Sequence, residues 1–408
     1  MKQEPTPHKV LPYGKQTIED DDIAAVIDVL KSDYLTTGPV TAQFEDAFSK
    51  EVEAPFAVAV NSGTSGLHLA MIALGIGADD AVIVPSVTFL ASANCAEYVG
   101  ADVVFADVNP KNGLMELEHI QKAYNEHTGK PIKAIILVHL NGQTTDIEAV
   151  SQFTKDNNLY LVEDACHALG GEFISKHQKT HKIGNSHYSD ITMFSGHPVK
   201  TIAMGEAGIL TTANEELYNT LKLARSHNMQ KDPSQMLNKE LAYDTDGSLN
   251  PWYYEMHEPG YNFRCSDIHC ALGLSQIKKL KSFVQKRQLL VNTYLELLPD
   301  LSDFLAPIEY NNHGNFGWHL FPVLCNFDAM GLSRKALMNK LSEYKIYTQV
   351  HYIPVSSQPY YQNKYPDNNL PGAMEYYNHV LSLPLFPSME IEDVQYVIKT
   401  LRDILHGQ

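Results

Sequence analysis

The sequence predicts an α/β fold, with a large domain on a mostly parallel β-sheet and a smaller C-terminal α+β domain. From about residue 17 to 265, short β-rich runs alternate with helical stretches. This alternation is typical of βαβ units, in which helices cover both faces of a parallel sheet. After about residue 265 the alternation stops and longer helical patterns dominate. A chain of 408 residues is long enough for two domains, so we expect them at 1–265 and 266–408.

The strands expected in the first domain are short apolar runs. They are residues 56–60, 81–84, 103–105, 134–138, 159–163, 191–194 and 209–211. The helices expected between them are residues 65–74, 89–99, 116–126 and 147–156. In sheets of this kind ligands bind beyond the carboxyl ends of the strands, so the loops that follow the strands are the first candidates for a site.

The second domain begins with a long helical stretch at residues 266–298 and continues with a strand at 318–324. A helix is expected at 333–344, with Ser333 as its N-cap. Two further helices are expected near 373–382 and 391–406.

Composition excludes some classes of protein. The net charge of −17 argues against nucleic-acid binding, which needs a basic surface, although a few local donors can still hold a phosphorylated ligand. The five cysteines form no CxxC pair and fit a reducing cytoplasm. Residues 1–8 lack the apolar core of a signal peptide, and no apolar run approaches the ~20 residues of a membrane span. No His/Cys group has metal-ligand spacing, so we expect no metal site.

Lys200 lies just after the Pro-marked turn that follows the strand at 191–194, and another apolar strand follows at 209–211. A lysine on a tight loop between two buried strands is a candidate nucleophile, because desolvation in a cleft lowers its pKa. The alternative is a solvated surface charge, which is the commoner role of lysine.

Three other loops carry groups that suit a phosphorylated aromatic ligand. Gly63, Thr64 and Ser65 join the strand at 56–60 to the next helix, as a phosphate cradle or as an ordinary N-capped turn. Asp164 ends the strand at 159–163, as the partner of a cationic group or as a helix N-cap. Phe89 follows the strand at 81–84, as a ring-stacking aromatic or as a core side chain.

Together these features are what pyridoxal 5′-phosphate (PLP) requires. A lysine forms the Schiff base, an acid keeps the pyridine nitrogen protonated so that the ring acts as an electron sink, and the phosphate needs a cradle. Each feature is weak alone, but all four occur on successive loops of one predicted sheet.

The chain resembles the DegT/DnrJ/EryC1/StrS family of PLP-dependent sugar aminotransferases, on the fold-type-I (aspartate-aminotransferase-like) scaffold. The resemblance runs from Leu11-Pro12-Tyr13-Gly14 to the final helices. Within the family the chain is most similar to enzymes that aminate C4 of a UDP-4-keto sugar on the pseudaminic acid pathway. The blocks that carry this similarity are Pro251–Met256 with its WYYEM run, Gly260-Tyr261-Asn262-Phe263-Arg264, and Gln349-Val350-His351-Tyr352-Ile353-Pro354.

The resemblance implies roles by position. Lys200 would bind the cofactor covalently and shuttle the proton, and Asp164 would pair with the pyridine nitrogen. The other cofactor contacts implied are Gly63, Thr64, Ser65, Phe89, His167 and Ser195. Asn262 would reach the phosphate of the neighbouring subunit, which implies a homodimer with shared sites. The candidates for the nucleotide sugar are Tyr13, Arg225, His227, His351 and Tyr352.

The sequence departs from the family pattern at two positions beside the lysine. The usual Ser-Phe-His-Pro reads Ser195-Gly196-His197-Pro198, and the usual Gly-Glu-Gly-Gly has alanine at position 207. If position 207 needs a positive φ, alanine there costs about 1 kcal/mol. Neither change removes a reactive group.

We therefore expect a cytoplasmic aminotransferase. It would move an amino group from an amino acid, expected to be L-glutamate, to the C4 ketone of a UDP-4-keto-6-deoxy-N-acetylhexosamine. One alternative is another nucleotide-4-keto or 3-keto sugar as acceptor. A related sugar 3-dehydratase would carry histidine in place of Lys200, and a non-catalytic PLP-binding regulator on the same scaffold would not need the Asp164–Lys200 pair.

Overall fold

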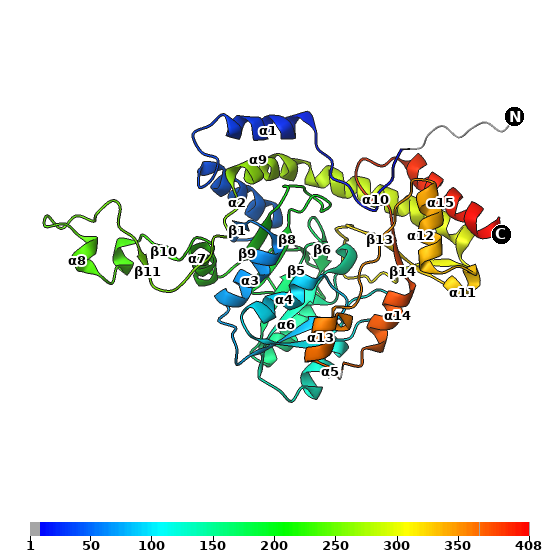
Figure 1. Cartoon of the computed structure of the whole chain (residues 1–408), viewed down its shortest axis with the longest axis horizontal. Helices are drawn as coiled ribbons and strands as arrows, with labels where there is room; N and C mark the ends of the chain where they lie inside the picture. Colours follow the sequence, from blue (N-terminus) through cyan, green and yellow to red (C-terminus); the bar gives the residue numbers. More distant parts are fainter. Residues whose placement is uncertain (1–8, 367, 408) are drawn as a thin grey trace.

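The computed structural model describes residues 9–366 and 368–407. Residues 1–8, on which the expectation of no signal peptide rests, lie outside this range. A seven-stranded sheet forms the centre of the molecule (Figure 1), in the order β1-β9-β8-β5-β4-β2-β3. Its strands are β1 (Phe56–Val60), β2 (Ala81–Pro85), β3 (Asp102–Ala106), β4 (Ile132–Val138), β5 (Tyr160–Asp164), β8 (Ile191–Ser195) and β9 (Gly208–Thr212). Only β9 runs antiparallel to its neighbours, so the prediction of an α/β fold with a mostly parallel sheet is confirmed.

The strands alternate their side chains between two apolar layers, which is why the sheet is covered on both faces. In β1, Ala57 and Ala59 face one layer, whereas Val58 and Val60 face the other. Helices that contribute to the first layer are α2 (Pro39–Val52), α5 (Leu117–Glu126), α6 (Ile147–Asp156) and α9 (Asp267–Gln276). Helices that contribute to the second are α3 (Gly63–Ala73), α4 (Leu90–Tyr98) and α7 (Glu215–Ala224).

The C-terminal part has its own core around an antiparallel three-stranded sheet of β12 (Leu305–Pro307), β13 (Phe321–Cys325) and β14 (Val380–Leu383). The helices here are α10 (Leu280–Leu297), α11 (Phe327–Met330), α12 (Arg334–Glu343), α13 (Pro359–Lys364), α14 (Pro371–His379) and α15 (Ile391–His406). Ser333 is the N-cap of α12, as expected, and its hydroxyl accepts from the backbone N–H of Ala336 at 3.2 Å. The division at 265/266 stays a prediction.

Two elements of this part differ from the expectation. The stretch 266–298 is not one helix, because a 3-10 turn at Ile277–Lys279 separates α9 from α10. Before that turn α9 packs on α1 (Asp20–Leu30) and α2, and after it α10 packs on α15. The expected helix at 373–382 ends early, because Val380–Leu383 pairs with β13 as a strand.

A projecting arm leaves the body after α7 (Figure 1). It consists of β10 (Met229–Gln230), α8 (Lys239–Ala242) and β11 (Glu255–Met256), and β10 pairs with β11. A separate hairpin joins β6 (Glu172–Ile174) to β7 (Thr180–Lys182). Within the described residues, none of the helices combines the length and apolar character needed to cross a lipid bilayer.

Candidate active site

A cavity of about 640 Å³ opens at the carboxyl ends of the parallel strands. Ten of the predicted site residues line it: Tyr13, Gly63, Thr64, Phe89, Asp164, His167, Ser195, Lys200, His351 and Tyr352. They come from segments spread over most of the chain. The cavity therefore brings together the groups that the loop positions predicted, together with residues from the C-terminal part.

Asp164 is the last residue of β5, and its buried carboxylate is held by two donors. The Ser92 hydroxyl, from α4, donates to Oδ2 at 2.7 Å. The backbone N–H of Cys166 donates to Oδ1 at 3.2 Å. An ionised carboxylate has about four acceptor positions, so Asp164 keeps the capacity to accept from a cationic N–H in the cavity.

Lys200 lies on the loop between β8 and β9, where its backbone N–H donates to His197 O at 2.9 Å. Its side chain lines the cavity. Burial lowers the pKa of the Lys200 amine below its usual range, although the nearby Asp164 favours the charged form. A larger fraction of this amine is therefore neutral, and so nucleophilic, than in an exposed lysine.

The N-terminus of α3 forms another wall of the cavity. Ser62 is the N-cap and accepts from the backbone N–H of Ser65 at 3.1 Å. A Cβ at Gly63 would lie only 3.1 Å from Met193 Cε and 3.5 Å from Ser195 Cβ, so the glycine lets this turn lie close to β8. N–H groups in the first turn of a helix lack partners within the helix and bind anions. The Ser65 hydroxyl is hydrogen-bonded to that of the N-cap residue Ser62, and Ser65 is not among the residues that line the cavity.

Two of the histidines that were predicted as site residues, His167 and His351, are held in the neutral form in the cavity. Burial, and then the charge of Lys200, lowers the pKa of His167 well below its usual range. Its Nδ1 accepts from the backbone N–H of Asn141 at 3.2 Å, so in the neutral ring Nε2 carries the proton and donates to Tyr352 Oη at 3.1 Å. The same causes lower the pKa of His351 to about 3, and its Nδ1 lies 2.9 Å from Ser382 Oγ.

Aromatic rings line the outer part of the cavity. Phe89 is the N-cap residue of α4 and lies at the rim, half exposed, with its ring centroid 6.2 Å from that of Tyr352. The Tyr13 ring lies 5.1 Å from the His351 ring. Phe89 is thus a rim aromatic rather than a core side chain.

Four predicted residues lie outside this lining: Ser65, Asn262, Arg225 and His227. The guanidinium of Arg225 donates to the Glu45 carboxylate and to Ala59 O, contacts within the body of the fold. Asn262 bridges to Ser226 at the base of the arm. Its predicted role at a neighbouring subunit's phosphate, like the sugar-binding roles of Arg225 and His227, stays a prediction.

Two further residues take part in the site. Ser92 lies inside the predicted helix at 89–99, three residues after Phe89, so helical spacing could have placed it on the cavity side. His319 lines the cavity, with its Nε2 3.5 Å from Lys200 Nζ. It lies in the stretch predicted as a strand, and no local pattern points to it.

The two departures from the family pattern lie against each other. A Cβ at Gly196 would lie 2.8 Å from Met204 Sδ and 3.0 Å from Ala207 Cβ, so these side chains fill the space beside the glycine. Ala207 is buried and does not adopt a positive φ. The strain considered for alanine at position 207 therefore does not arise.

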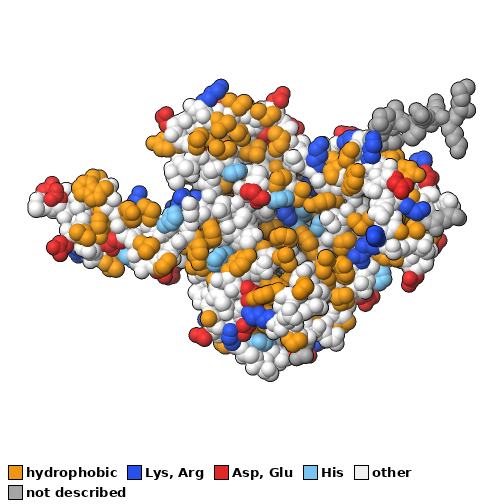
Figure 2. All heavy atoms as spheres, in the orientation of Figure 1, with side chains coloured by type: hydrophobic (Ala, Val, Ile, Leu, Met, Phe, Trp, Pro, Cys, Tyr) orange, Lys and Arg blue, Asp and Glu red, His pale blue; other side chains and the backbone are white. Residues whose placement is uncertain are grey.

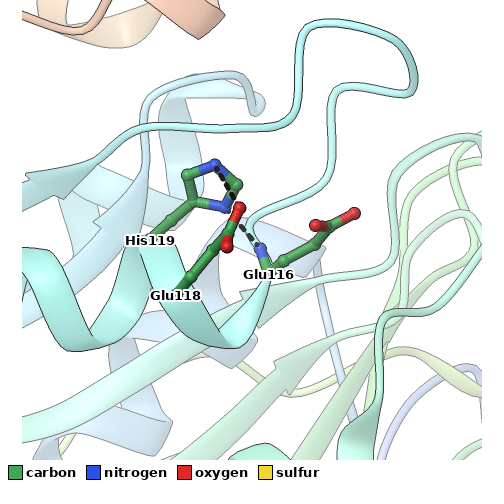
Figure 3. Close-up of side chains that lie close together, drawn as sticks. All are labelled: Glu116, Glu118 and His119. Atoms are coloured by element: carbon green, nitrogen blue, oxygen red, sulfur yellow. Dashed lines mark hydrogen bonds and ion pairs between the residues drawn. The ribbon is translucent and has the colours of Figure 1, made fainter.

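Glu116, Glu118 and His119 come together at the start of α5 (Figure 3). His119 Nδ1 accepts from the backbone N–H of Glu116 at 3.1 Å. The Glu116 carboxylate accepts from the side-chain amides of Asn109 at 3.0 Å and Asn112 at 3.3 Å. The pairing of Glu116 with His119 is a capping box at the start of α5, and the two asparagines tie the Glu116 carboxylate to the preceding loop. None of the three clustered residues lines the cavity.

Comparison with known proteins places the chain among aminotransferases. Residues 16–402 match the model of the DegT/DnrJ/EryC1/StrS aminotransferase family. The chain is 36% identical over 400 residues to the spore coat polysaccharide biosynthesis protein SpsC of Bacillus subtilis, and the match covers 97% of each chain.

Comparison with solved structures also finds aminotransferases. The chain superposes with a TM-score of 0.85 on Helicobacter pylori PseC, described as an aminotransferase involved in the biosynthesis of pseudoaminic acid, with 27% identity over 98% of this chain and all of that one. It also superposes on Spr1654 of Streptococcus pneumoniae, which is described as a putative sugar aminotransferase. The PLP form of that protein gives a TM-score of 0.84 with 27% identity, covering 98% of this chain and 99% of that one.

Proposed function

The chain belongs to the DegT/DnrJ/EryC1/StrS aminotransferase family, and on that premise we propose that it aminates the C4 ketone of a UDP-4-keto-6-deoxy-N-acetylhexosamine. The amino donor that we propose is an amino acid, namely L-glutamate. The observation that carries the proposal is the presence of Lys200 and Asp164 in one cavity, Lys200 on the loop after β8 and Asp164 at the end of the neighbouring strand β5.

The residues present fit PLP. Lys200 offers a desolvated amine, Asp164 has spare acceptor capacity, and the first turn of α3 with Ser195 offers donors for a phosphate. Phe89 offers an aromatic face at the rim. When bound, PLP supplies an electron sink that stabilises negative charge at the carbon bearing the transferred amino group.

The chain's own residues would hold and orient the reactants and move the proton. Lys200 Nζ, when neutral, is the base in the cavity that can take a proton and return it. Asp164 Oδ atoms, fixed by Ser92 and Cys166, would hold an N–H⁺ at the end of β5. The Tyr352 hydroxyl, which accepts from His167, would be kept in place beside them.

The proposed acceptor rests on resemblance and on the comparisons. PseC is described as acting in the biosynthesis of pseudoaminic acid, and SpsC as acting in the biosynthesis of a spore coat polysaccharide. Tyr13, His351 and Tyr352 line the cavity of this chain and are the proposed contacts to the sugar. We further propose a cytoplasmic homodimer in which Asn262, Arg225 and His227 contribute at the shared site.

The test is amino transfer from L-glutamate to a panel of UDP- and TDP-linked 4-keto and 3-keto sugars, followed by mass spectrometry of the sugar product. Transfer should be greatest to the UDP-4-keto-6-deoxy-N-acetylhexosamine, and Lys200→Ala should lower turnover by at least about 10³-fold, because it removes both nucleophile and base. The exposed Lys50→Ala is the matched control and should retain wild-type turnover.

Full turnover in Lys200→Ala would refute the proposed mechanism. Transfer to a different nucleotide keto sugar would keep the mechanism and change the acceptor.

A further inference from the structure

His319 is buried and lines the cavity beside Lys200. Its Nε2 is 3.5 Å from Lys200 Nζ, and its ring centroid is 4.4 Å from that of His167. The backbone is held on both sides, since His319 N donates to Asn141 O at 3.2 Å and His319 O accepts from buried Arg287 at 3.0 Å. These contacts hold the backbone of His319, and its ring packs against that of His167, independently of any occupant of the cavity.

The position of the imidazole proton follows from the two ring nitrogens. Burial, and then the positive charge of Lys200, lowers the pKa of His319 well below its usual range, so the ring is neutral and carries one N–H. Nδ1 is buried and has no hydrogen-bond partner among the described residues. A buried N–H without a partner costs about 1–3 kcal/mol, whereas an N–H at Nε2 can donate to Lys200 Nζ. The geometry therefore favours the tautomer with the proton on Nε2.

We propose that His319 is a positioning residue for Lys200, whose Nε2–H donates to the lone pair of the Lys200 amine and thereby favours the free amine over the ammonium. The contact is at the long limit of a hydrogen bond, a distance common in sites that tighten when occupied.

Other charged and titratable groups around Lys200 act in both directions. Asp164, the last residue of β5, favours the ammonium, whereas Arg287, from α10, disfavours it. Cys166, two residues after β5, would also favour the ammonium as a thiolate, but burial raises the pKa of its thiol well above the usual range. His167 and His351 are held neutral, and burial raises the pKa of Tyr352 well above its usual range, so these three carry no charge near pH 7. His319 is thus the neighbour whose hydrogen bond selects for the neutral amine.

The test measures Lys200 directly. The full-length protein, dialysed free of carbonyl compounds, is reductively methylated with formaldehyde and cyanoborohydride at a series of pH values. Peptide mass spectrometry then gives the labelling rate of Lys200, with exposed Lys50 as an internal reference. The labelling rate at each pH reports the fraction of free amine, and the midpoint of the rate–pH curve reports the apparent pKa of each amine.

In His319→Phe, which keeps a ring but removes the N–H, the Lys200 midpoint should rise by about one pH unit, so that labelling near pH 7 slows about tenfold. In His319→Gln, whose amide N–H reaches a similar distance, it should stay near the wild-type value. His351→Phe is the matched control, because it removes another neutral imidazole whose Nδ1 bonds to Ser382 rather than to Lys200. Its midpoint should move by less than half as much.

An unchanged or lowered midpoint in His319→Phe would overturn the inference, because Nε2 would then be uncoupled or would accept from the ammonium. If His319→Phe does not fold, the ¹⁵N chemical shifts of the wild-type ring decide. A proton on Nε2 supports the inference, and a proton on Nδ1 refutes it.

The use of this contact in amino transfer rests on the proposed function, but the labelling does not. A raised midpoint in His319→Phe together with full turnover in Lys200→Ala would keep the inference and refute the function. An unchanged midpoint in His319→Phe together with lost turnover in Lys200→Ala would refute the inference and keep the proposed function.

Discussion

Gly196 shows how a single residue affects the packing beside the loop that carries Lys200. Met204 and Ala207 occupy the space where its side chain would lie. Gly196→Ala should therefore lower the free energy of unfolding by about 1–3 kcal/mol, the usual cost of overpacking, as measured by urea denaturation. Gly77→Ala is the matched control, because a Cβ there meets nothing within 4 Å, and its stability should stay within about 0.5 kcal/mol of wild type. Equal effects at both positions would contradict the packing argument.

His351 makes the stability of the protein depend on pH. The unfolded chain binds a proton at this residue below pH ~6.5, whereas the folded protein does so only near pH 3, because of burial and the charge of Lys200. The unfolded state thus binds more protons between these values, so stability is lost as pH falls through this range. The contribution of His351 to the slope is about 1.4 kcal/mol per pH unit.

His351→Gln should therefore reduce the loss of unfolding free energy between pH 6 and pH 5 by about 1.2 kcal/mol, measured by urea denaturation of the cofactor-free protein. His167 and His319, whose pKa values are lowered in the same direction, should leave a residual slope. Between pH 7.5 and 8.5 the slopes of wild type and variant should coincide. A variant slope equal to wild type at pH 5–6 would contradict the assignment.

At the scale of elements, one carboxylate joins two helices. Asp267, in the first turn of α9, is fully buried and accepts from the backbone N–H groups of Gly38 at 2.7 Å and Thr41 at 2.9 Å. Gly38 is the N-cap of α2 and has no side chain that could cap the helix. Asp267 thus supplies a cap for α2 from another helix and favours negative charge at its N-terminus.

Asp267→Ala should lower the free energy of unfolding by about 2–3 kcal/mol, because two partly buried backbone donors lose their charged acceptor. Ser333→Ala, which removes an exposed cap within a single helix, should cost only about 1 kcal/mol. Denaturant titrations of both variants measure the difference. A cost for Asp267→Ala no larger than that of Ser333→Ala would contradict a joining role.

Some elements could be predicted and others could not, for a physical reason. β1, α6 and α15 have the predicted bounds, because apolar periodicity within a short segment is enough to define them. The apolar run Val380–Leu383 fits a helix end or a buried strand equally well. Only its pairing with β13 makes it a strand.

At the scale of the whole molecule, the arm presents apolar surface to solvent. Trp252 and Leu237 are 73% and 76% exposed, and Figure 2 shows apolar side chains along the arm and over α1. The arm is ordered by its own contacts, since the Glu255 carboxylate accepts from the backbone N–H groups of Leu237 and Asn238 at 2.8 Å. A second copy of the chain in the proposed homodimer would cover such a surface.

Trp252→Asp should weaken the homodimer at least tenfold, because an aromatic anchor buried between subunits commonly contributes about 2 kcal/mol or more. Sedimentation velocity over a concentration series measures this. Leu289→Asp, at an exposed position on α10, is the control and should leave association unchanged. A monomeric wild-type protein would refute the dimer, and an unaffected Trp252→Asp would remove the arm from its interface.

The sequence by itself determined the sheet and the residues at its edge. Asp164 ends a strand, and Lys200 and the turn at Gly63 each follow one. The carboxyl ends of parallel strands meet at one edge, so local pattern was enough to bring these residues together. The tertiary structure alone decided which side chains surround them. His319, Ser92 and the neutral state of His351 depend on burial and on contacts between segments far apart in the chain, and local periodicity carries no record of either.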